Sequence, residues 1–232
     1  MNFGVVIFPG SNCDKDIISC IERTVNQKVI ELWHKDTDLQ NCDVIFLPGG
    51  FSFGDYLRSG AIAKFSPIME KVIEFGKNGG YIIGICNGFQ ILTESGLLPG
   101  ALLHNTSNKF ICKNVFLKIN NSNTLITNSY EKNVIKVPVA HGEGRFFAVE
   151  YTMKNLKQND QIIFKYCNSN GEFLDSSNPN GSLDNIAGIC NKEKNIFGMM
   201  PHPERAADVL LHNTDGVALF KSIMNYINSE KN

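Results

Sequence analysis

Short apolar runs alternate with segments of helical periodicity over the first part of the chain. Four apolar runs predict strands that are buried on both faces, namely Phe3–Phe8, Val29–Trp33, Val44–Leu47 and Tyr81–Ile85. Apolar residues recur at helical spacing in three further segments, which are Asp14–Asn26, Ile68–Phe75 and Phe89–Glu94. Buried strands separated by helices indicate an α/β fold, with a mostly parallel central sheet and helices on both of its faces.

The remainder of the chain departs from this regular alternation. Its strand-like segments are Phe110–Ile119, Val134–Val139, Ile162–Cys167, Ile186–Cys190 and Ile196–Met200. Its two predicted helices are a short one at Thr152–Asn159 and an amphipathic one at about Gly216–Ile227. The polar stretches between the strands favour a mixed-strand extension of the sheet. The chain has neither an internal repeat nor a Pro- or Ser-rich linker, so residues 1–232 are expected to form a single domain.

Composition narrows the possible classes of function. Hydrophobic residues make up 43% of the chain and charged residues 19%, a balance typical of a packed domain and not of a disordered one. The formal net charge is -1, with 22 Lys and Arg against 23 Asp and Glu. Without an excess of positive charge, nucleic acid is disfavoured as the main partner. No apolar run approaches the roughly 18 residues that a membrane-spanning helix needs.

Cysteine usage indicates a reducing compartment. The seven cysteines are scattered and form no CxxC pair, so a structural zinc site is not expected and no metal is predicted. The opening sequence MNFGVVIFPG lacks a basic region followed by a long apolar one, so we expect no signal peptide. The protein is therefore expected in the cytoplasm, with its thiols free.

Cys86 is the candidate nucleophile. It lies in the segment Gly84-Ile-Cys-Asn-Gly-Phe-Gln90, which follows a predicted buried strand and opens a predicted helix. Such a strand-to-helix turn exposes one reactive side chain, and the helix N-terminus favours the thiolate. The alternative is a packed core thiol, because free cysteine is among the most buried residue types. The glycines at 84 and 88 favour the nucleophile.

The other six cysteines lack this context. Four of them, Cys20, Cys112, Cys167 and Cys190, lie in apolar segments and are interpreted as core thiols. Cys42 is interpreted as a loop residue. Cys13 lies in a Gly-Ser-Asn-Cys-Asp loop and stays undecided between a position near a site and packing.

His202 is the candidate base, since a cysteine nucleophile needs a base and the base needs an orienting group. In Pro201-His-Pro-Glu-Arg205 the prolines restrict the backbone, and Glu204 can accept a hydrogen bond from the imidazole. The alternative is a surface turn with an incidental histidine. His141 and Arg145 lie in a second candidate segment, His-Gly-Glu-Gly-Arg-Phe, which is either a loop near a ligand or a polar turn.

The remaining three histidines, His34, His104 and His212, have no supporting neighbours and are interpreted as surface residues or as residues whose hydrogen bonds are satisfied.

The loop Pro48-Gly-Gly-Phe-Ser-Phe-Gly-Asp55 is the candidate oxyanion site. Consecutive glycines allow backbone N–H groups to approach a ligand, and the Asn87 N–H could join the one at Gly50. The alternative is a simple turn at a strand end. The loop lacks the Lys-Ser/Thr of a phosphate-binding loop, and no GxGxxG follows any strand.

The order of these three elements resembles that of the class I (triad) glutamine amidotransferases, a flavodoxin-like family. Further motifs resemble the glutaminase subunits of phosphoribosylformylglycinamidine synthases within that class. They are Val6-Ile-Phe-Pro-Gly-Ser-Asn-Cys-Asp14, Gly49-Gly-Phe-Ser-Phe-Gly-Asp-Tyr56, His141-Gly-Glu-Gly-Arg-Phe146, Asn178-Pro-Asn-Gly-Ser182 and Met199-Met-Pro-His-Pro-Glu-Arg205. The resemblance covers nearly the whole chain.

The resemblance implies a Cys86–His202–Glu204 triad that hydrolyses glutamine to glutamate and ammonia. It implies N–H groups at Gly50 and Asn87 as the oxyanion site. It further implies substrate-binding residues, which are Gly49, Gln90, His141 and Arg145. For the segment His141–Phe146 the alternative is a surface that faces the partner. The ammonia would pass to a large synthetase subunit, which binds ATP and magnesium and converts formylglycinamide ribonucleotide to the amidine. A small adaptor subunit completes the implied complex, and this chain itself would carry no cofactor.

Three other hypotheses about the function stay open. The chain could be another triad amidotransferase that donates ammonia to a different acceptor. It could be a deglycase or peptidase of similar architecture, although such relatives usually have a histidine directly after the cysteine, where this chain has Asn87. It could also be a non-enzymatic flavodoxin-like binding module, in which Cys86 would be dispensable.

Overall fold

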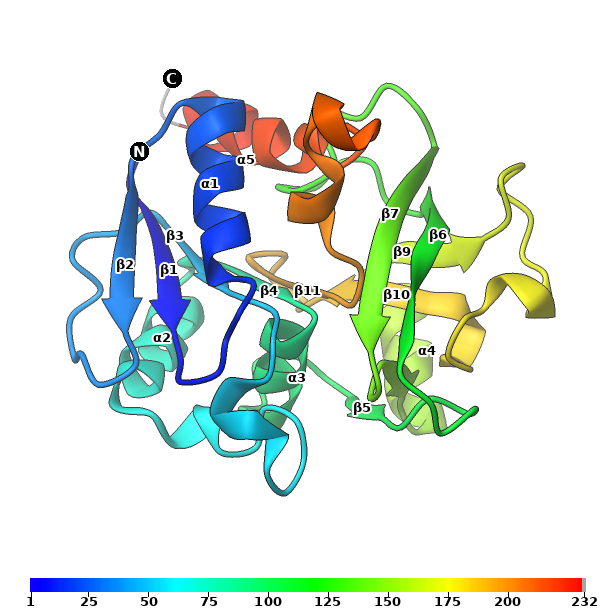
Figure 1. Ribbon diagram of the computed structural model, residues 1–232, viewed down its shortest axis with the longest axis horizontal. Coiled ribbons are helices and arrows are strands. Elements are labelled where there is room, and N and C mark those ends of the chain that lie inside the picture. Colours follow the sequence, from blue (N-terminus) through cyan, green and yellow to red (C-terminus); the bar gives the residue numbers. More distant parts are fainter. Residues whose placement is uncertain (231–232) are drawn as a thin grey trace.

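The computed structural model describes residues 1–230, whose strands form a nine-stranded mixed sheet and a separate two-stranded one (Figure 1). The large sheet has the order β2-β1-β3-β4-β11-β10-β9-β6-β7. Its parallel part comprises β2 (Val29–Trp33), β1 (Phe3–Ile7), β3 (Val44–Leu47), β4 (Tyr81–Ile85) and β11 (Ile196–Met199). The antiparallel part comprises β10 (Ile186–Cys190), β9 (Ile162–Cys167), β6 (Ile111–Ile119) and β7 (Val134–His141).

Five α-helices are described, and they cover both faces of the sheet. They are α1 (Asp14–Val25), α2 (Pro67–Lys77), α3 (Asn87–Glu94), α4 (Glu150–Gln158) and α5 (Val217–Glu230). Helices α1 and α5 pack together on one side of the parallel strands, and α2 and α3 lie on the other (Figure 1). None of these helices is long and apolar enough to cross a membrane.

Short 3₁₀ turns complete the described secondary structure. They are η1 (Ser52–Asp55), η2 (Ala63–Phe65), η3 (Asp175–Ser177), η4 (Leu183–Asn185), η5 (Pro203–Ala206) and η6 (Val209–Leu211). Two of them, η1 and η5, follow β3 and β11 and therefore lie next to the candidate site residues.

The inner parallel strands β1, β3, β4 and β11 are buried on both faces, as their continuous apolar runs predict, whereas the edge strand β2 leaves Glu31 and Trp33 exposed. Phe3, Val5 and Val6 of β1 are fully buried, and Phe46 of β3 stacks on Phe220 of α5 with ring centroids 6.0 Å apart. Burial of such side chains contributes about 1.5–3 kcal/mol each. The α/β fold with a mostly parallel sheet, a mixed extension and flanking helices is thereby confirmed.

Several predicted boundaries differ from the observed ones. Helix α1 ends at Val25 because Asn26 adopts a left-handed conformation with φ of 50°, which terminates the helix. Strand β7 extends to His141, since its last residues pair with the first residues of β6. The two-stranded sheet of β5 (Ala101–Leu103) and β8 (Arg145–Phe147) is too short to produce a periodic signal and was not predicted.

Cys112 is exposed, so its interpretation as a core thiol is wrong. It lies in the first half of β6, which pairs with β7 alone, while β9 pairs only with the second half from Phe116 onward. The first half of β6 consequently projects beyond the body of the sheet. Cys20, Cys167 and Cys190 are buried, as expected.

Candidate active site

Four parallel strands deliver candidate site residues to one edge of the sheet. The carboxyl ends of β1, β3, β4 and β11 lead into the segments that contain Cys13, Gly49, Cys86 and His202. The carboxyl edge of an α/β sheet is where ligands commonly bind. Neighbouring strands of the sheet therefore bring together residues that lie far apart in the sequence.

Cys86 occupies a strained turn between β4 and α3. Its φ of 51° and ψ of -105° are rare for a residue with a side chain and cost about 1–3 kcal/mol. The flanking glycines are required by packing, because a Cβ on Gly84 would lie 2.6 Å from the Gly88 carbonyl carbon. A Cβ on Gly88 would lie 1.9 Å from the Leu47 carbonyl oxygen. The close packing of α3 on β3 and β4 thus holds the thiol at the start of the helix.

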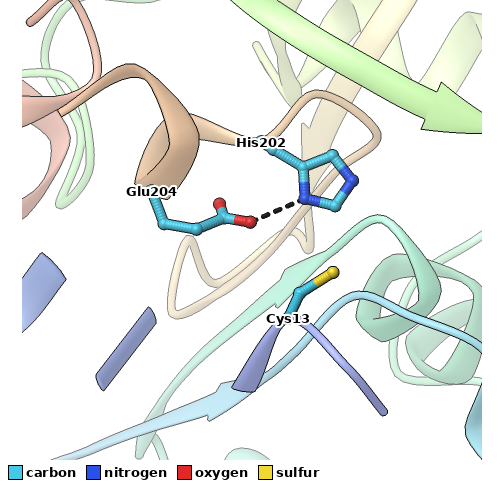
Figure 2. A group of neighbouring side chains, drawn as sticks. All are labelled: Cys13, His202 and Glu204. Carbon is cyan, nitrogen blue, oxygen red and sulfur yellow. Dashed lines mark hydrogen bonds and ion pairs between the residues drawn. The ribbon is translucent and has the colours of Figure 1, made fainter. Parts of the chain in front are cut away.

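His202 and Glu204 form a buried hydrogen-bonded pair. His202 Nδ1 lies 2.6 Å from Glu204 Oε1, and the two side chains are 1% and 0% exposed (Figure 2). The His202 N–H donates to the Pro138 carbonyl at 2.9 Å, which ties the segment to β7. Because Nδ1 faces the carboxylate, Nε2 is the nitrogen available for proton transfer, and it has no hydrogen-bond partner among the described residues.

The charge state of His202 follows from its neighbours. Burial alone opposes the charged form, but the Glu204 carboxylate and then Cys86 raise the pKa of His202 well above its ordinary value. An imidazolium at neutral pH, paired with a carboxylate on one side, can give a proton to a departing group.

Gly49 marks the point where these groups converge. A Cβ on Gly49 would lie 2.7 Å from His202 Cε1, 3.2 Å from Cys13 Sγ and 3.3 Å from Cys86 Cβ. The imidazole and both sulfur-bearing side chains therefore surround this one residue. Any side chain at position 49 would occupy the space between the nucleophile and the base.

A small cavity of about 160 Å³ opens beside Cys86. Among the candidate residues, Gly50, Gln90 and His141 line it together with Cys86. The candidates outside its lining are Gly49, Asn87, Arg145, His202 and Glu204. The cavity wall also includes polar residues outside the predicted set, which are Asp55, Ser59, His104 and Glu143.

Gln90 and Asn87 brace the cavity wall through their side-chain amides. Gln90 Nε2 donates to the Glu143 carbonyl oxygen at 2.6 Å, and its Oε1 accepts from Asn87 Nδ2 at 2.9 Å. Asn87 Oδ1 in turn accepts from the Ser52 N–H at 3.2 Å. The loops that follow β3 and β7 are thereby both linked to the first turn of α3.

His141 and Arg145 separate in the structure, although they are close in sequence. His141 is buried, with Nδ1 3.0 Å from Asn105 Oδ1, and burial followed by the charge of His202 lowers its pKa to about 4. It is therefore neutral at physiological pH. Arg145 Nε donates to the His104 carbonyl oxygen at 2.9 Å, which directs the guanidinium away from the cavity lining.

Sequence reasoning missed several residues of the cavity. Asp55 is half-buried, and burial, with a smaller contribution from the Glu143 charge, raises its pKa to about 6. His104, interpreted from sequence as lacking supporting neighbours, has Nε2 3.4 Å from Glu143 Oε1. The only local signal for the two carboxylates was their position next to glycines, in Phe53-Gly-Asp and His141-Gly-Glu.

Cys13, His202 and Glu204 form a group of three possible metal ligands, with ligand atoms within 4.8 Å of one another (Figure 2). However, Arg205 Nη2 donates to Cys13 Sγ at 3.1 Å. A guanidinium keeps its charge in proteins, so a divalent cation beside the same sulfur would be repelled. We interpret the group as support for the base and not as a metal centre.

Comparison with known proteins places this geometry in a family. The family model of the CobB/CobQ-like glutamine amidotransferase domain matches residues 1–227. The phosphoribosylformylglycinamidine synthase subunit PurQ of Synechocystis sp. is 54% identical and aligns with 95% of this chain and 99% of its own length. The same subunit of Moorella thermoacetica is 52% identical, over 97% and 96% of the two chains.

Two solved structures resemble this chain. PurLQS from Thermotoga maritima includes a chain with a TM-score of 0.85 and 42% identity, over 97% of this chain and 98% of that one. A glutamine amidotransferase from the same organism has a TM-score of 0.57 at 15% identity, over 100% of this chain and 85% of that one, and supports the fold alone.

The chain therefore belongs to the glutamine amidotransferase family, and it is an enzyme of that class. Within the class its relatives are PurQ subunits, the glutaminase subunits of phosphoribosylformylglycinamidine synthase, and the chain is a member of this group.

Proposed function

We propose that Cys86, His202 and Glu204 are the catalytic triad of a glutaminase that supplies ammonia for the synthesis of formylglycinamidine ribonucleotide. The observation that carries the proposal is the convergence of the strained Cys86 turn and the buried His202–Glu204 pair around Gly49. A nucleophile, a base and an orienting carboxylate are the parts that acyl transfer through cysteine requires.

In the proposed reaction, the Cys86 thiolate attacks the side-chain carboxamide carbon of glutamine. The N–H groups of Gly50 and Asn87 stabilise the oxyanion, since Gly50 lines the cavity and Asn87 opens α3 with an N–H that has no acceptor within the helix. The His202 imidazolium gives a proton to the leaving nitrogen, and ammonia departs. Water, deprotonated by His202, then cleaves the thioester and releases glutamate.

Substrate contacts are assigned from the cavity. Gln90 and His141 line it, and Gly49 leaves room between the nucleophile and the base, so we assign these three to the glutamine site. We assign Arg145 to holding the loop of His104 and not to direct contact with glutamine, because its Nε is hydrogen-bonded to that backbone.

The chemistry of the released ammonia indicates which partner proteins this chain needs. Free ammonia in neutral water becomes ammonium, which is not a nucleophile, so the product must pass to its acceptor through a path that excludes water. We propose that a large synthetase subunit, which holds ATP and magnesium, receives it and that a small adaptor subunit completes the assembly. The match to a chain of PurLQS supports this arrangement. We place the reaction in the cytoplasm, where a thiol nucleophile stays reduced.

Glutamate release tests the proposal. The purified chain is assayed with glutamine alone, and then with the synthetase subunit, the ribonucleotide substrate and ATP. We expect glutamate release that is enhanced by the complete mixture, and formylglycinamidine ribonucleotide as the product. An electrophilic diazo-ketone analogue of glutamine should label Cys86 alone, as mapped by peptide mass spectrometry. Labelling of a different cysteine, or glutamate release without any amidine product, would contradict the assignment.

A further inference from the structure

Cys13 is a second buried thiol at the candidate base. It precedes the first residue of α1, its residue is 3% exposed, and its sulfur lies beside the His202–Glu204 pair (Figure 2). Cys13 lacks the strand-to-helix turn that marks Cys86 as the nucleophile. Its proximity to the base therefore requires another explanation.

The Cys13 sulfur is connected to α1 through Arg205. Arg205 Nη2 donates to Cys13 Sγ at 3.1 Å, and Arg205 Nε donates to Asp16 Oδ2 at 2.9 Å. Cys13 directly precedes α1 and Asp16 lies in its first turn, whereas Arg205 belongs to η5, the turn that carries Glu204. Two hydrogen bonds thus join the turn that holds the base to a helix that contributes no triad residue.

The same two hydrogen bonds also determine how strongly the positive charge of Arg205 acts on the His202 imidazole. Arg205 follows His202 by three residues, and an unscreened guanidinium so close would oppose protonation of the imidazole. The Asp16 carboxylate and the Cys13 sulfur take up its N–H groups instead. Cys13 Sγ and His202 Cε1 also both lie close to Gly49, at 3.2 Å and 2.7 Å from the position that a Cβ on this glycine would take.

We propose that Cys13, held by Arg205, is a positioning residue that keeps His202 in the orientation required for glutamine hydrolysis. The inference rests on the proposed triad function. Cys13 does not form a bond with the substrate. Its hydrogen-bond partner and its volume fix the imidazole between Glu204 and Cys86, and its sulfur favours the imidazolium form.

The test uses the complete synthetase complex with Cys13→Ala and Cys13→Ser variants of this chain. We expect Cys13→Ala to lower kcat for glutamine hydrolysis about tenfold, with a KM changed less than about threefold, because the substrate cavity is untouched. The limb of the pH–rate profile that reports His202 should move to lower pH by about one unit, which corresponds to about tenfold in protonation. Cys13→Ser retains an acceptor for Arg205 and should restore most of the profile.

Cys42→Ala is the matched control, because Cys42 is a buried loop thiol outside the site. It should leave kcat and the pH profile unchanged. Ammonia-dependent synthesis by the Cys13→Ala complex should equal that of the wild type, since ammonia bypasses the glutaminase step. A kcat and pH profile of Cys13→Ala equal to those of the wild type would overturn the inference, and so would a loss of activity without a shifted profile.

Failure of this inference is distinguishable from failure of the proposed function. If the wild-type complex releases glutamate and Cys13→Ala matches it, only the role of Cys13 is wrong. If the wild-type complex does not release glutamate from glutamine, the triad assignment itself fails and the role of Cys13 falls with it. Thermal unfolding of both variants separates a folding defect from a shifted base, because a lowered Tm alone would not move the pH profile.

Discussion

The Cys86 N–H donates a 2.7 Å hydrogen bond to the Met199 carbonyl oxygen, which couples the nucleophile turn to the strand that leads to the base. Strands β4 and β11 are parallel neighbours, with Ile85 opposite Met199. His202 follows Met199 by three residues, so the register of this one strand pair sets the separation of the thiol and the imidazole. A slip of one residue would turn the side chains of the shifted strand to its other face and separate the thiol from the imidazole.

Cys86→Ala should abolish glutamine use without preventing synthesis. Removing the nucleophile is expected to lower glutamine-dependent amidine formation by at least about 10³-fold, since Cys13, the other thiol at the base, does not line the substrate cavity. Ammonium salt at high pH should support synthesis by the same complex at the wild-type rate. The measurement is product formation with each nitrogen donor, and Cys42→Ala serves as a control. Persistent glutamine-dependent activity would exclude the triad.

Gly49→Ala should displace the base. The added Cβ would lie 2.7 Å from His202 Cε1, and the ring cannot retreat because Glu204 holds it. We expect a loss of about 1–3 kcal/mol of stability from overpacking and a fall in kcat larger than the change in KM. Gly79→Asn is a control, since a Cβ there meets nothing within 4 Å and asparagine tolerates its positive φ. Chemical denaturation and steady-state kinetics report the two effects, and unchanged kinetics for Gly49→Ala would refute the geometry.

Glu204→Gln should lower the pKa of His202. The carboxylate is the strongest influence that raises this pKa against the effect of burial, and glutamine cannot supply its charge. We expect kcat to fall roughly 10²–10⁴-fold, by analogy with loss of the orienting carboxylate in other triads. The residual activity should have a pH profile shifted to lower pH. Glu70→Gln, an exposed substitution on α2, should behave as the wild type. An unshifted profile would show that Glu204 does not control the imidazole.

Asp55→Asn should stabilise the protein in a pH-dependent way. The pKa of Asp55 is raised to about 6 in the folded state, chiefly by burial, against about 3.9 when unfolded. The native state therefore holds an extra proton between these pH values, and stability falls as pH rises through 6. Asparagine removes this dependence and tolerates the φ of 53° at this position.

Thermal unfolding at several pH values measures this effect. The Tm of Asp55→Asn should exceed that of the wild type at pH 7.5, and the difference should vanish below about pH 3, where the carboxyl is neutral in both states. Asp175→Asn, which alters an exposed carboxylate, should follow the wild type throughout. A constant difference at all pH values would indicate that the effect does not come from ionisation of Asp55.

Much of the fold could be predicted because its signals are local. The bounds of β2, β3, β4, β9 and β10 coincide with the predicted runs, because the apolar residues that these strands bury are adjacent in the sequence. The end of α1 was misplaced by one residue because Asn26 is a polar cap whose conformation the periodicity does not report. Strands β5 and β8 were missed, since three residues carry no measurable period.

The candidate site likewise has features that the local sequence indicates and features that only the tertiary structure shows. By itself, the sequence determined the Cys86 turn and the His202–Glu204 pair, because glycines, prolines and the spacing of acid and base act within a few residues. Only the tertiary structure decided that Cys13 and Arg205 flank the base, that Asp55 and Glu143 line the cavity, and that Arg145 does not. These contacts join segments up to 192 residues apart. Their distances depend on strand order and register, which no local pattern encodes.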